Sequence, residues 1–232
     1  MNTNRWHRRI AVFSAVFLAI TAVTGILWAY APHLYFQDGY LKKKTKFQGP
    51  ALSRAKISQK DALEAAVAVF NTEKGIETLS LRAEASHLVY EIVRKDGKDH
   101  RSVLIDALSG DVLSPVSEKL ATEFAAQYVG GNPPVKETEA LDEYRHRSGK
   151  KIKSVYRVAF TAPGKPEIFI DRNSGLIVEE SDRSRVFHFW VMKLHQLQFF
   201  GVKKEFTIIP GLALILLVIT GTVMWLRRFR AS

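Results

Sequence analysis

The sequence predicts an α+β protein in which two tandem units, each a helix with an antiparallel sheet, lie between two transmembrane helices. Three observations predict this fold class. Uncharged apolar stretches lie near both ends of the 232-residue chain, at 10–31 and 207–226. Between them, one helix-and-strand pattern occurs twice. The chain has no cysteine, which excludes disulfides, thiolate nucleophiles and cysteine-ligated metal sites.

The two apolar stretches have the length of membrane spans. About 20 helical residues cross a hydrocarbon layer roughly 30 Å thick, and a backbone in hydrocarbon must form its hydrogen bonds within its own segment. Each stretch is therefore expected to be a helix. A cleaved signal peptide is the alternative for the first stretch, because Ala29-Tyr30-Ala31 resembles a cleavage site. Since the apolar run is longer than a signal core of about 7–15 residues, and Pro32 would follow the cut, we expect a retained anchor.

Flanking charge predicts the orientation. Arginines adjoin both spans at their outer ends, and neither 1–9 nor 227–232 contains an acidic residue. Positive flanks stay in the cytoplasm, and long loops are translocated largely regardless of charge; we therefore let the termini outweigh the lysine-rich run at 42–46. We expect a bacterial inner-membrane protein with cytoplasmic termini and a periplasmic central region. The excess of 34 basic over 23 acidic residues then indicates contact with membrane lipids, and no nucleic-acid partner is expected.

The central region contains an internal repeat. Asp106 and Asp171 each begin an Asp-x-x-Ser-Gly element, and Tyr90 and Tyr156 mark matching strand patterns at nearly the same separation. Two landmarks that agree within one residue indicate duplication. In each element the aspartate can accept hydrogen bonds from turn amides and the glycine can adopt positive φ. Both elements are therefore predicted to be hairpin turns rather than catalytic sites.

These observations divide the chain into eight segments. An aromatic-rich helix expected at the membrane interface joins the second unit to the second span. In chain order the segments are a cytoplasmic N-terminus (1–9), transmembrane helix 1 (10–31), a linker (32–56), unit 1 (57–115), unit 2 (116–182), an interfacial helix (186–200), transmembrane helix 2 (207–226) and a cytoplasmic C-terminus (227–232).

Several of these motifs resemble a known family. A helix followed by strands ending in I-D-x-x-S-G-x-[IV] resembles the PepSY domain, found here in tandem. Arg5-Trp6-His7-Arg8-Arg9 before a helix with Thr24-Gly25, and Lys193-Leu194-His195-Gln196-Leu197 before a helix with Thr220-Gly221, resemble the PepSY-associated transmembrane (PepSY-TM) family. The resemblance covers nearly the whole chain, which looks like a small two-span member.

The resemblance implies a role in iron metabolism or in regulation. Larger members have four spans and are associated with iron uptake, and some look like haem-bearing reductases of ferric siderophores. Other PepSY proteins look like regulators or inhibitors of peptidases. This chain departs from the larger members because it has two spans and no flavin or nicotinamide domain, so an electron path within one chain would be incomplete.

The histidines at the membrane edges, His7, His33, His188 and His195, are the candidate cofactor-binding residues. Bis-imidazole ligation of haem b needs two histidines at a common depth, on opposite faces of the iron. His7 and His33 are separated by about 39 Å along a straight helix and cannot share one iron. A single-chain haem would pair His33 with His188 or His195, whereas a haem held by His7 would need a homodimer or a membrane redox partner.

Each histidine also has a simpler interpretation. Polar histidines on a helix at 186–200 suit the headgroup level of a membrane, and His7 can be one more basic residue of the juxtamembrane flank. His87, His100 and His146 lie in the repeat region without metal-ligand spacing and are interpreted as ordinary exposed residues.

Two functions remain open from the sequence. One is haem-linked electron transfer, or an accessory role in ferric-siderophore reduction and iron uptake, with haem iron held by His7 or His195 and a periplasmic ferric complex as partner. The other is a membrane-anchored binding or regulatory module whose periplasmic pair contacts a peptidase without any cofactor. No catalytic residue is predicted, since H-E-x-x-H, G-x-S-x-G and G-x-x-x-x-G-K-[ST] motifs are absent from the sequence. Enzyme activity would require this chain to be part of a membrane oxidoreductase.

Overall fold

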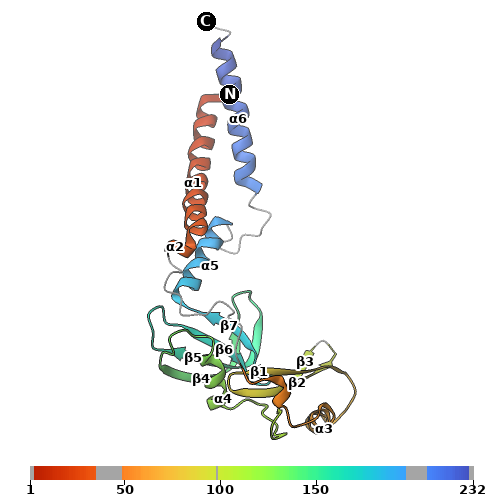
Figure 1. The fold of residues 1–232 in the computed structure, drawn as a ribbon. Helices are drawn as coiled ribbons and strands as arrows, with labels where there is room; N and C mark the ends of the chain where they lie inside the picture. The colour runs from red at the N-terminus through yellow and green to blue at the C-terminus, as the bar shows by residue number, and fades with distance from the viewer. Residues whose placement is uncertain (1–2, 35–48, 98, 197–207, 230–232) are drawn as a thin grey trace. The chain divides into compact units, whose positions relative to one another are not determined.

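Figure 1 shows the computed structural model, which describes residues 3–34, 49–97, 99–196 and 208–229. The chain divides into two compact units, a helical unit (Met1–Gln37 with Ser184–Ser232) and a mixed unit (Asp38–Arg183). Helices and two antiparallel sheets occur together in the described residues. The α+β class predicted from the sequence is therefore confirmed.

The mixed unit is built around two antiparallel sheets in which consecutive strands are neighbours. The first sheet has the strand order β1-β2-β3 and the second has the order β4-β5-β6-β7. The strands are β1 (Ile76–Glu84), β2 (His87–Asp96), β3 (Asp99–Asp106), β4 (Val135–Arg145), β5 (Lys151–Phe160), β6 (Glu167–Asp171) and β7 (Ile177–Ser181). The helices of this unit are η1 (Leu52–Arg54), α3 (Gln59–Phe70) and α4 (Glu118–Ala126).

Helix α3 begins at the capping box predicted from the sequence. The Asp61 backbone N–H donates to Ser58 Oγ at 3.2 Å, and the Ser58 N–H donates to Asp61 Oδ2 at 3.3 Å. These two bonds satisfy backbone donors that a helix start otherwise leaves unpaired. The prediction that a helix starts at Ser58, with aspartate in place of the usual glutamate, is confirmed.

The central strand of the first sheet, β2, is buried on both faces from Leu88 to Ile92, since successive side chains of a strand point to opposite faces of the sheet. Leu88, Tyr90 and Ile92 of β2 form a core with Ala62 and Ala66 of α3 on one face. The intervening residues of β2 point to the opposite face. That face is covered by the second half of the mixed unit rather than by solvent.

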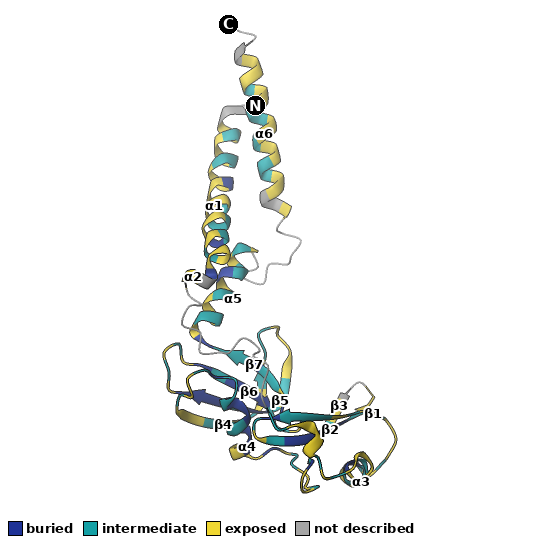
Figure 2. Cartoon of the chain, in the orientation of Figure 1, coloured by how far each residue is buried: buried dark blue, intermediate teal, exposed yellow. Residues whose placement is uncertain are grey.

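Helix α4 lies in a core shared by the two sheets. Val89 of β2 and Leu104 of β3 are fully buried in the same cluster as Phe124 of α4 and Ile168 and Ile170 of β6. Figure 2 shows buried segments in dark blue along the central strands of the mixed unit. Each half alone is small for an independent core, and the shared helix explains how both halves bury enough apolar surface.

Both Asp-x-x-Ser-Gly elements are hairpin turns, as predicted. The Oδ1 of each aspartate accepts from the backbone N–H groups two and three residues ahead, at 2.7 and 3.1 Å for Asp106 and at 2.9 and 2.8 Å for Asp171. Gly110 and Gly175 have φ of +86° and +63°, which side chains with a Cβ rarely adopt. The aspartates therefore hold turns.

Gly175 also packs where a side chain would not fit. A Cβ at this position would lie 2.8 Å from Phe124 Cε2 and 3.0 Å from Leu104 Cδ1. Both atoms belong to the core shared by the two sheets. At Gly110 the nearest atom to an added Cβ is Ile57 Cδ1 at 3.5 Å, an ordinary contact. The second turn is thus fixed against the core and the first is not.

The helical unit contains an apolar helix with the length of a membrane span. Within the described residues, the segment Arg5–Ala29 is the one helix that is both long and apolar enough to cross a bilayer, and most of its apolar window is exposed. The apolar part of the last helix, Gly211–Arg227, is shorter. The helices of this unit are α1 (Thr3–Ala29), α2 (Ala31–Leu34), α5 (Arg183–His195) and α6 (Ile208–Phe229).

Helices α1 and α6 run antiparallel. His7, near the start of α1, contacts Thr220 toward the end of α6, and Phe13 of α1 lines a groove with Leu212 near the start of α6. The start of α1 and the end of α6 therefore lie at the same end of this helix pair (Figure 1). The predicted interfacial helix at 186–200 corresponds to α5 in part, and residues 197–200 lie outside the described residues.

Candidate functional site

Two of the candidate histidines each contact a Thr-Gly dipeptide of another helix. His7 Nδ1 lies 2.8 Å from Thr220 Oγ1, and His195 Nδ1 lies 3.2 Å from Thr24 Oγ1. The neighbouring glycines are Gly221 and Gly25, in the same two dipeptides that mark the family resemblance. The helical unit therefore contains two similar arrangements, one on α6 and one on α1.

The contact between His7 and Thr220 is suited to a tautomer that carries the proton on Nδ1. Thr220 Oγ1 also lies 2.7 Å from the Leu216 carbonyl, to which the hydroxyl can donate its single hydrogen. With the hydroxyl in that orientation, Thr220 Oγ1 accepts from the Nδ1–H of His7. In a neutral imidazole this leaves Nε2 with an unprotonated lone pair, which is the form that ligates a metal.

The contacts of His195 lead to the same tautomer. Its Nδ1 lies 3.2 Å from the Thr21 carbonyl oxygen, which can only accept. The Thr24 hydroxyl donates to the Ile20 carbonyl at 2.6 Å, so its oxygen also accepts from His195. The Nδ1–H is thus shared between two acceptors, and Nε2 again keeps its lone pair. Among the described residues, neither His7 nor His195 has a hydrogen bond at Nε2.

Small residues let both rings lie close to a helix backbone. A Cβ at Gly25 would be 3.3 Å from His195 Cε1, and a Cβ at Gly221 would be 3.6 Å from His7 Cε1. The indole of Trp28 stacks on His195 with ring centroids 6.1 Å apart. A larger residue at Gly25 would displace the His195 ring.

The two histidines lie at different levels of α1. His7 belongs to α1 itself, and His195 contacts that helix at Thr24, 17 residues further along. At 1.5 Å per residue this separation is about 26 Å. His7 and His195 therefore cannot ligate the same iron, and they define two separate positions.

The other two membrane-edge histidines are placed differently. His33 lies in α2, and within the described residues no hydrogen bond or ring contact joins it to His195. His188 lies in the middle of α5, where burial lowers the pKa of its imidazole. Among the described residues, neither His33 nor His188 contacts His7.

The three histidines of the repeat region are not all exposed as predicted. His100 is exposed, but the side chains of His87 and His146 are half-buried, at 29% and 32% exposure. His87 Nε2 lies 3.0 Å from Glu123 Oε2, and this carboxylate explains why the residue sits partly inside. Within the described residues, no group of three or more His, Asp or Glu side chains could hold a metal ion.

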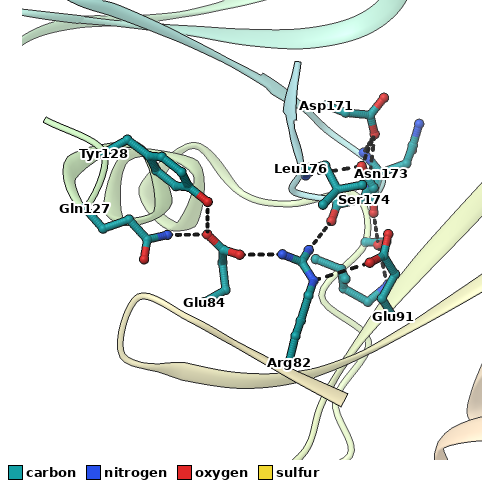
Figure 3. A network of polar contacts seen from close by, with 11 residues as sticks. Arg82, Glu84, Glu91, Gln127, Tyr128, Asp171, Asn173, Ser174 and Leu176 are labelled. Carbon is teal, nitrogen blue, oxygen red and sulfur yellow. Dashed lines mark hydrogen bonds and ion pairs between the residues drawn. The ribbon is translucent and has the colours of Figure 1, made fainter. Parts of the chain in front are cut away.

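A buried polar network joins the two halves of the mixed unit (Figure 3). Arg82 of β1 forms an ion pair with Glu84, and its Nε lies 3.4 Å from Glu91 Oε2. Its Nη2 donates a hydrogen bond to the Ser174 carbonyl at 2.9 Å. The carbonyl belongs to the second Asp-x-x-Ser-Gly turn. Arg82 therefore links the first sheet to that turn. No local sequence pattern indicated this contact, because the two residues are 92 positions apart.

The end of α4 completes the network. Tyr128 OH donates to Glu84 Oε1 at 3.2 Å, and the Gln127 side-chain amide donates to the same oxygen. Desolvation raises the pKa values of Glu84 and Glu91, although Arg82 opposes the shift. Burial and the nearby Glu84 raise the pKa of Tyr128 to about 12. The network therefore links the two halves of the mixed unit and places one cation, Arg82, between two carboxyl groups, Glu84 and Glu91.

A long apolar helix, in one chain with an α+β unit of two sheets, indicates a membrane-associated protein. The chain belongs to the family described as PepSY-associated TM region, whose family model matches residues 2–228. No curated protein matches the chain. Among solved structures it is similar to the Bacillus megaterium YpeB C-terminal domain, with 14% identity, a TM-score of 0.24, and coverage of 62% of this chain and 69% of that chain.

Proposed function

We propose that this protein holds haem b through His7 and His195 and serves membrane electron transfer linked to ferric-siderophore reduction and iron uptake. The observation that carries the proposal is the pair of contacts from His7 Nδ1 to Thr220 and from His195 Nδ1 to Thr24 and the Thr21 carbonyl. With the Nδ1–H donated to these acceptors, each Nε2 lone pair would be available for iron. Hydrogen bonding at the second ring nitrogen is the usual support for a metal-ligating histidine.

Apolar side chains near His7 support a haem there. Gly25 and Gly221 let the imidazoles pack directly against the helix backbone. An apolar groove of about 350 Å³ between α1 and α6 is lined by Trp6 and Phe13, which flank His7 in the sequence of α1, and haem needs apolar walls that exclude water. When bound, haem would supply a one-electron couple. The chain's own residues would hold and orient it, with Thr220 fixing His7 and Thr24 fixing His195.

Each histidine would be one protein ligand of a haem, and the second ligand would come from elsewhere. For His195 the candidates within the chain are His33 and His188. For His7 the candidate is a histidine of a second copy or of a membrane redox partner. Because the two positions lie about 26 Å apart along α1, each would belong to a separate haem.

The proposal includes a two-span topology in the bacterial inner membrane. Support comes from the antiparallel packing of α1 and α6 and from the uncharged stretch of each helix. The arginine flanks favour cytoplasmic termini, and the mixed unit would then be periplasmic as a tandem PepSY-like pair. A reporter fused after residue 232 should be active in the cytoplasm, and activity only in the periplasm would contradict this topology.

The haem content of the purified protein tests the proposal. We expect His7→Ala and His195→Ala each to lower the haem bound per chain by about half, and the double variant to bind none. His100→Ala is the control, because His100 is exposed in the mixed unit. Equal haem content in all variants would contradict ligation by these residues.

A binding role is the second candidate function, and a cleft in the mixed unit favours it. The cleft has a volume of about 1040 Å³ and is lined by residues of both sheets. A membrane-anchored module that contacts a peptidase or another protein would need such a surface. This role requires no cofactor.

A further inference from the structure

The cleft of the mixed unit borders a free strand edge. Its lining includes Arg101, Ser102 and Val103, which are consecutive residues of β3. Side chains of successive strand residues point to opposite faces of a sheet, so a cleft that contacts all three must wrap around the edge of the strand. Among the described residues, the strand order β1-β2-β3 leaves this edge of β3 without a neighbouring strand at Arg101–Val103, and one isolated bridge pairs Ile105 with Val112 further along the same edge.

The backbone groups on this edge can be assigned from neighbouring hydrogen bonds. The Leu104 carbonyl accepts from the Leu113 N–H at 2.8 Å, and the Leu104 N–H donates to Ser114 Oγ at 2.8 Å. Leu104 therefore points its backbone groups away from β2. Because these groups alternate along an antiparallel strand, Ser102 and His100 also direct their N–H and C=O groups outward, beside the cleft.

The rim of the cleft carries available positive charge. Lys150 is exposed in the turn between β4 and β5. The Arg101 side chain is 68% exposed, and its nearest carboxylate, Asp96 at 3.8 Å, is held more closely by Arg94 at 2.9 Å. His100 also lines the cleft, and its Nε2 lies 3.4 Å from Glu77 Oε2. Arg101 and Lys150 therefore favour a negatively charged occupant.

The two acidic residues of the lining are already engaged. Glu91 lies 3.4 Å from the Nε of Arg82, and Asp171 accepts the amides of its own turn. Exposed apolar side chains are also present, with Val69 and Leu176 each 43% exposed and lining the cleft. The surface thus combines free backbone groups, positive charge and apolar contacts.

We propose that this cleft binds an extended acidic peptide segment of another protein, which adds as a strand to the free edge of β3. Main-chain hydrogen bonds to the edge supply affinity in this mode of recognition, and side-chain contacts supply specificity. Acidic side chains of the peptide meet Arg101 and Lys150, and apolar ones meet Val69 and Leu176. The proposal supplies the ligand for the binding role named above and does not depend on haem.

Binding of synthetic peptides to the detergent-purified full chain tests the proposal. The probe is a fluorescent blocked peptide of about six alternating Glu and Val residues, the length of a typical strand. We expect saturable binding, no comparable binding of a Lys-Val peptide, and about tenfold or greater loss when alternate amides of the Glu-Val peptide are N-methylated. Equal binding of the N-methylated peptide would exclude strand addition.

Variants of the cleft supply the matched test on the protein side. Arg101→Glu with Lys150→Glu should weaken the Glu-Val peptide about tenfold or more, whereas Lys60→Glu, an exposed change on α3 outside the cleft, should not. Ser102→Pro removes an outward N–H without breaking the ladder to β2 and should also weaken binding.

Three outcomes would overturn the proposal. The first is no peptide binding at all, and the second is peptide binding that the paired charge reversals leave unchanged. The third is competition by free glutamate at the same concentration, which would indicate a site for small anions. Haem content measured on the same preparations separates this proposal from the electron-transfer role, because either property can fail while the other persists.

Discussion

His7 Nδ1 lies 2.8 Å from Thr220 Oγ1 and joins residues that are 213 positions apart, near the two ends of the chain. The contact between His195 and Thr24 repeats this arrangement across 171 positions. In both cases the threonine hydrogen is already donated to its own helix. In this hydrogen-bonding pattern the imidazole is the donor, and its other nitrogen keeps the lone pair that iron would need.

Removing the threonine hydroxyl should weaken the haem site without removing the ligand. We expect Thr220→Val to lower haem affinity at the His7 position by about 10- to 100-fold, the usual effect of losing a partner of a ligating histidine. Thr220→Ser keeps the hydroxyl and should retain the affinity. Titration of the apoprotein with haem measures both. Equal affinity of the Val and Ser variants would show that the hydroxyl does not support His7.

The two turn glycines should differ sharply in their tolerance of alanine. Both have positive φ, but only Gly175 faces Phe124 and Leu104 at distances too short for a Cβ. We expect Gly175→Ala to lower the free energy of unfolding by about 1–3 kcal/mol more than Gly110→Ala. Melting followed by circular dichroism in the strand region measures the difference. A Gly110 variant as unstable as the Gly175 variant would contradict the shared core.

The turn aspartates should tolerate asparagine better than alanine. An asparagine carbonyl oxygen can still accept the two amides that Asp171 accepts at 2.9 and 2.8 Å, whereas alanine leaves them without this acceptor. We expect Asp171→Ala to cost about 1 kcal/mol or more of stability and Asp171→Asn to cost less. The same melting experiment measures both. If the two variants were equally unstable, the hydrogen bonds to the turn would not be the reason for the aspartate.

The buried carboxyl groups should make the mixed unit less stable as the pH rises. Desolvation raises the pKa values of Glu84 and Glu91 above the usual 4.5, so the folded state binds protons more tightly than the unfolded state does. Their contribution is fully present below pH 4.5 and is lost as the pH rises through the folded pKa. The free energy of unfolding of Glu84→Gln, relative to that of the native chain, should therefore increase as the pH rises from about 4 to about 7.

Unfolding free energies of Glu84→Gln and of the native chain, measured across this range, test the pH prediction. Glu64→Gln is the control, because Glu64 is an exposed residue of α3. A difference between Glu84→Gln and the native chain that stays constant with pH would contradict the raised pKa.

Local patterns predicted much of the mixed unit. The capping box at Ser58 and the turns at Asp106 and Asp171 depend on residues within five positions of one another, so their spacing alone indicated them. The strands followed from alternation and β-branched residues. The α+β class and the family could both be predicted because these signals repeat along the chain.

Long-range contacts were not predictable in the same way. The side chain of Arg82 contacts the turn at Ser174 across 92 positions, and α4 packs on both sheets. No periodic pattern in the sequence indicates either contact. The sequence identified His7 and His195 as candidates, but it did not indicate that Thr220 and Thr24 contact them. It also predicted His87 to be exposed, because its partner Glu123 lies in a different element.

An absorption spectrum of the detergent-purified chain from haem-replete cells, recorded oxidised and after dithionite reduction, tests the central claim most directly. The account predicts a Soret band that sharpens and shifts on reduction in the native protein and is absent from the His7→Ala, His195→Ala double variant. A native protein without visible absorption, or a double variant with the full spectrum, would contradict haem ligation by these histidines.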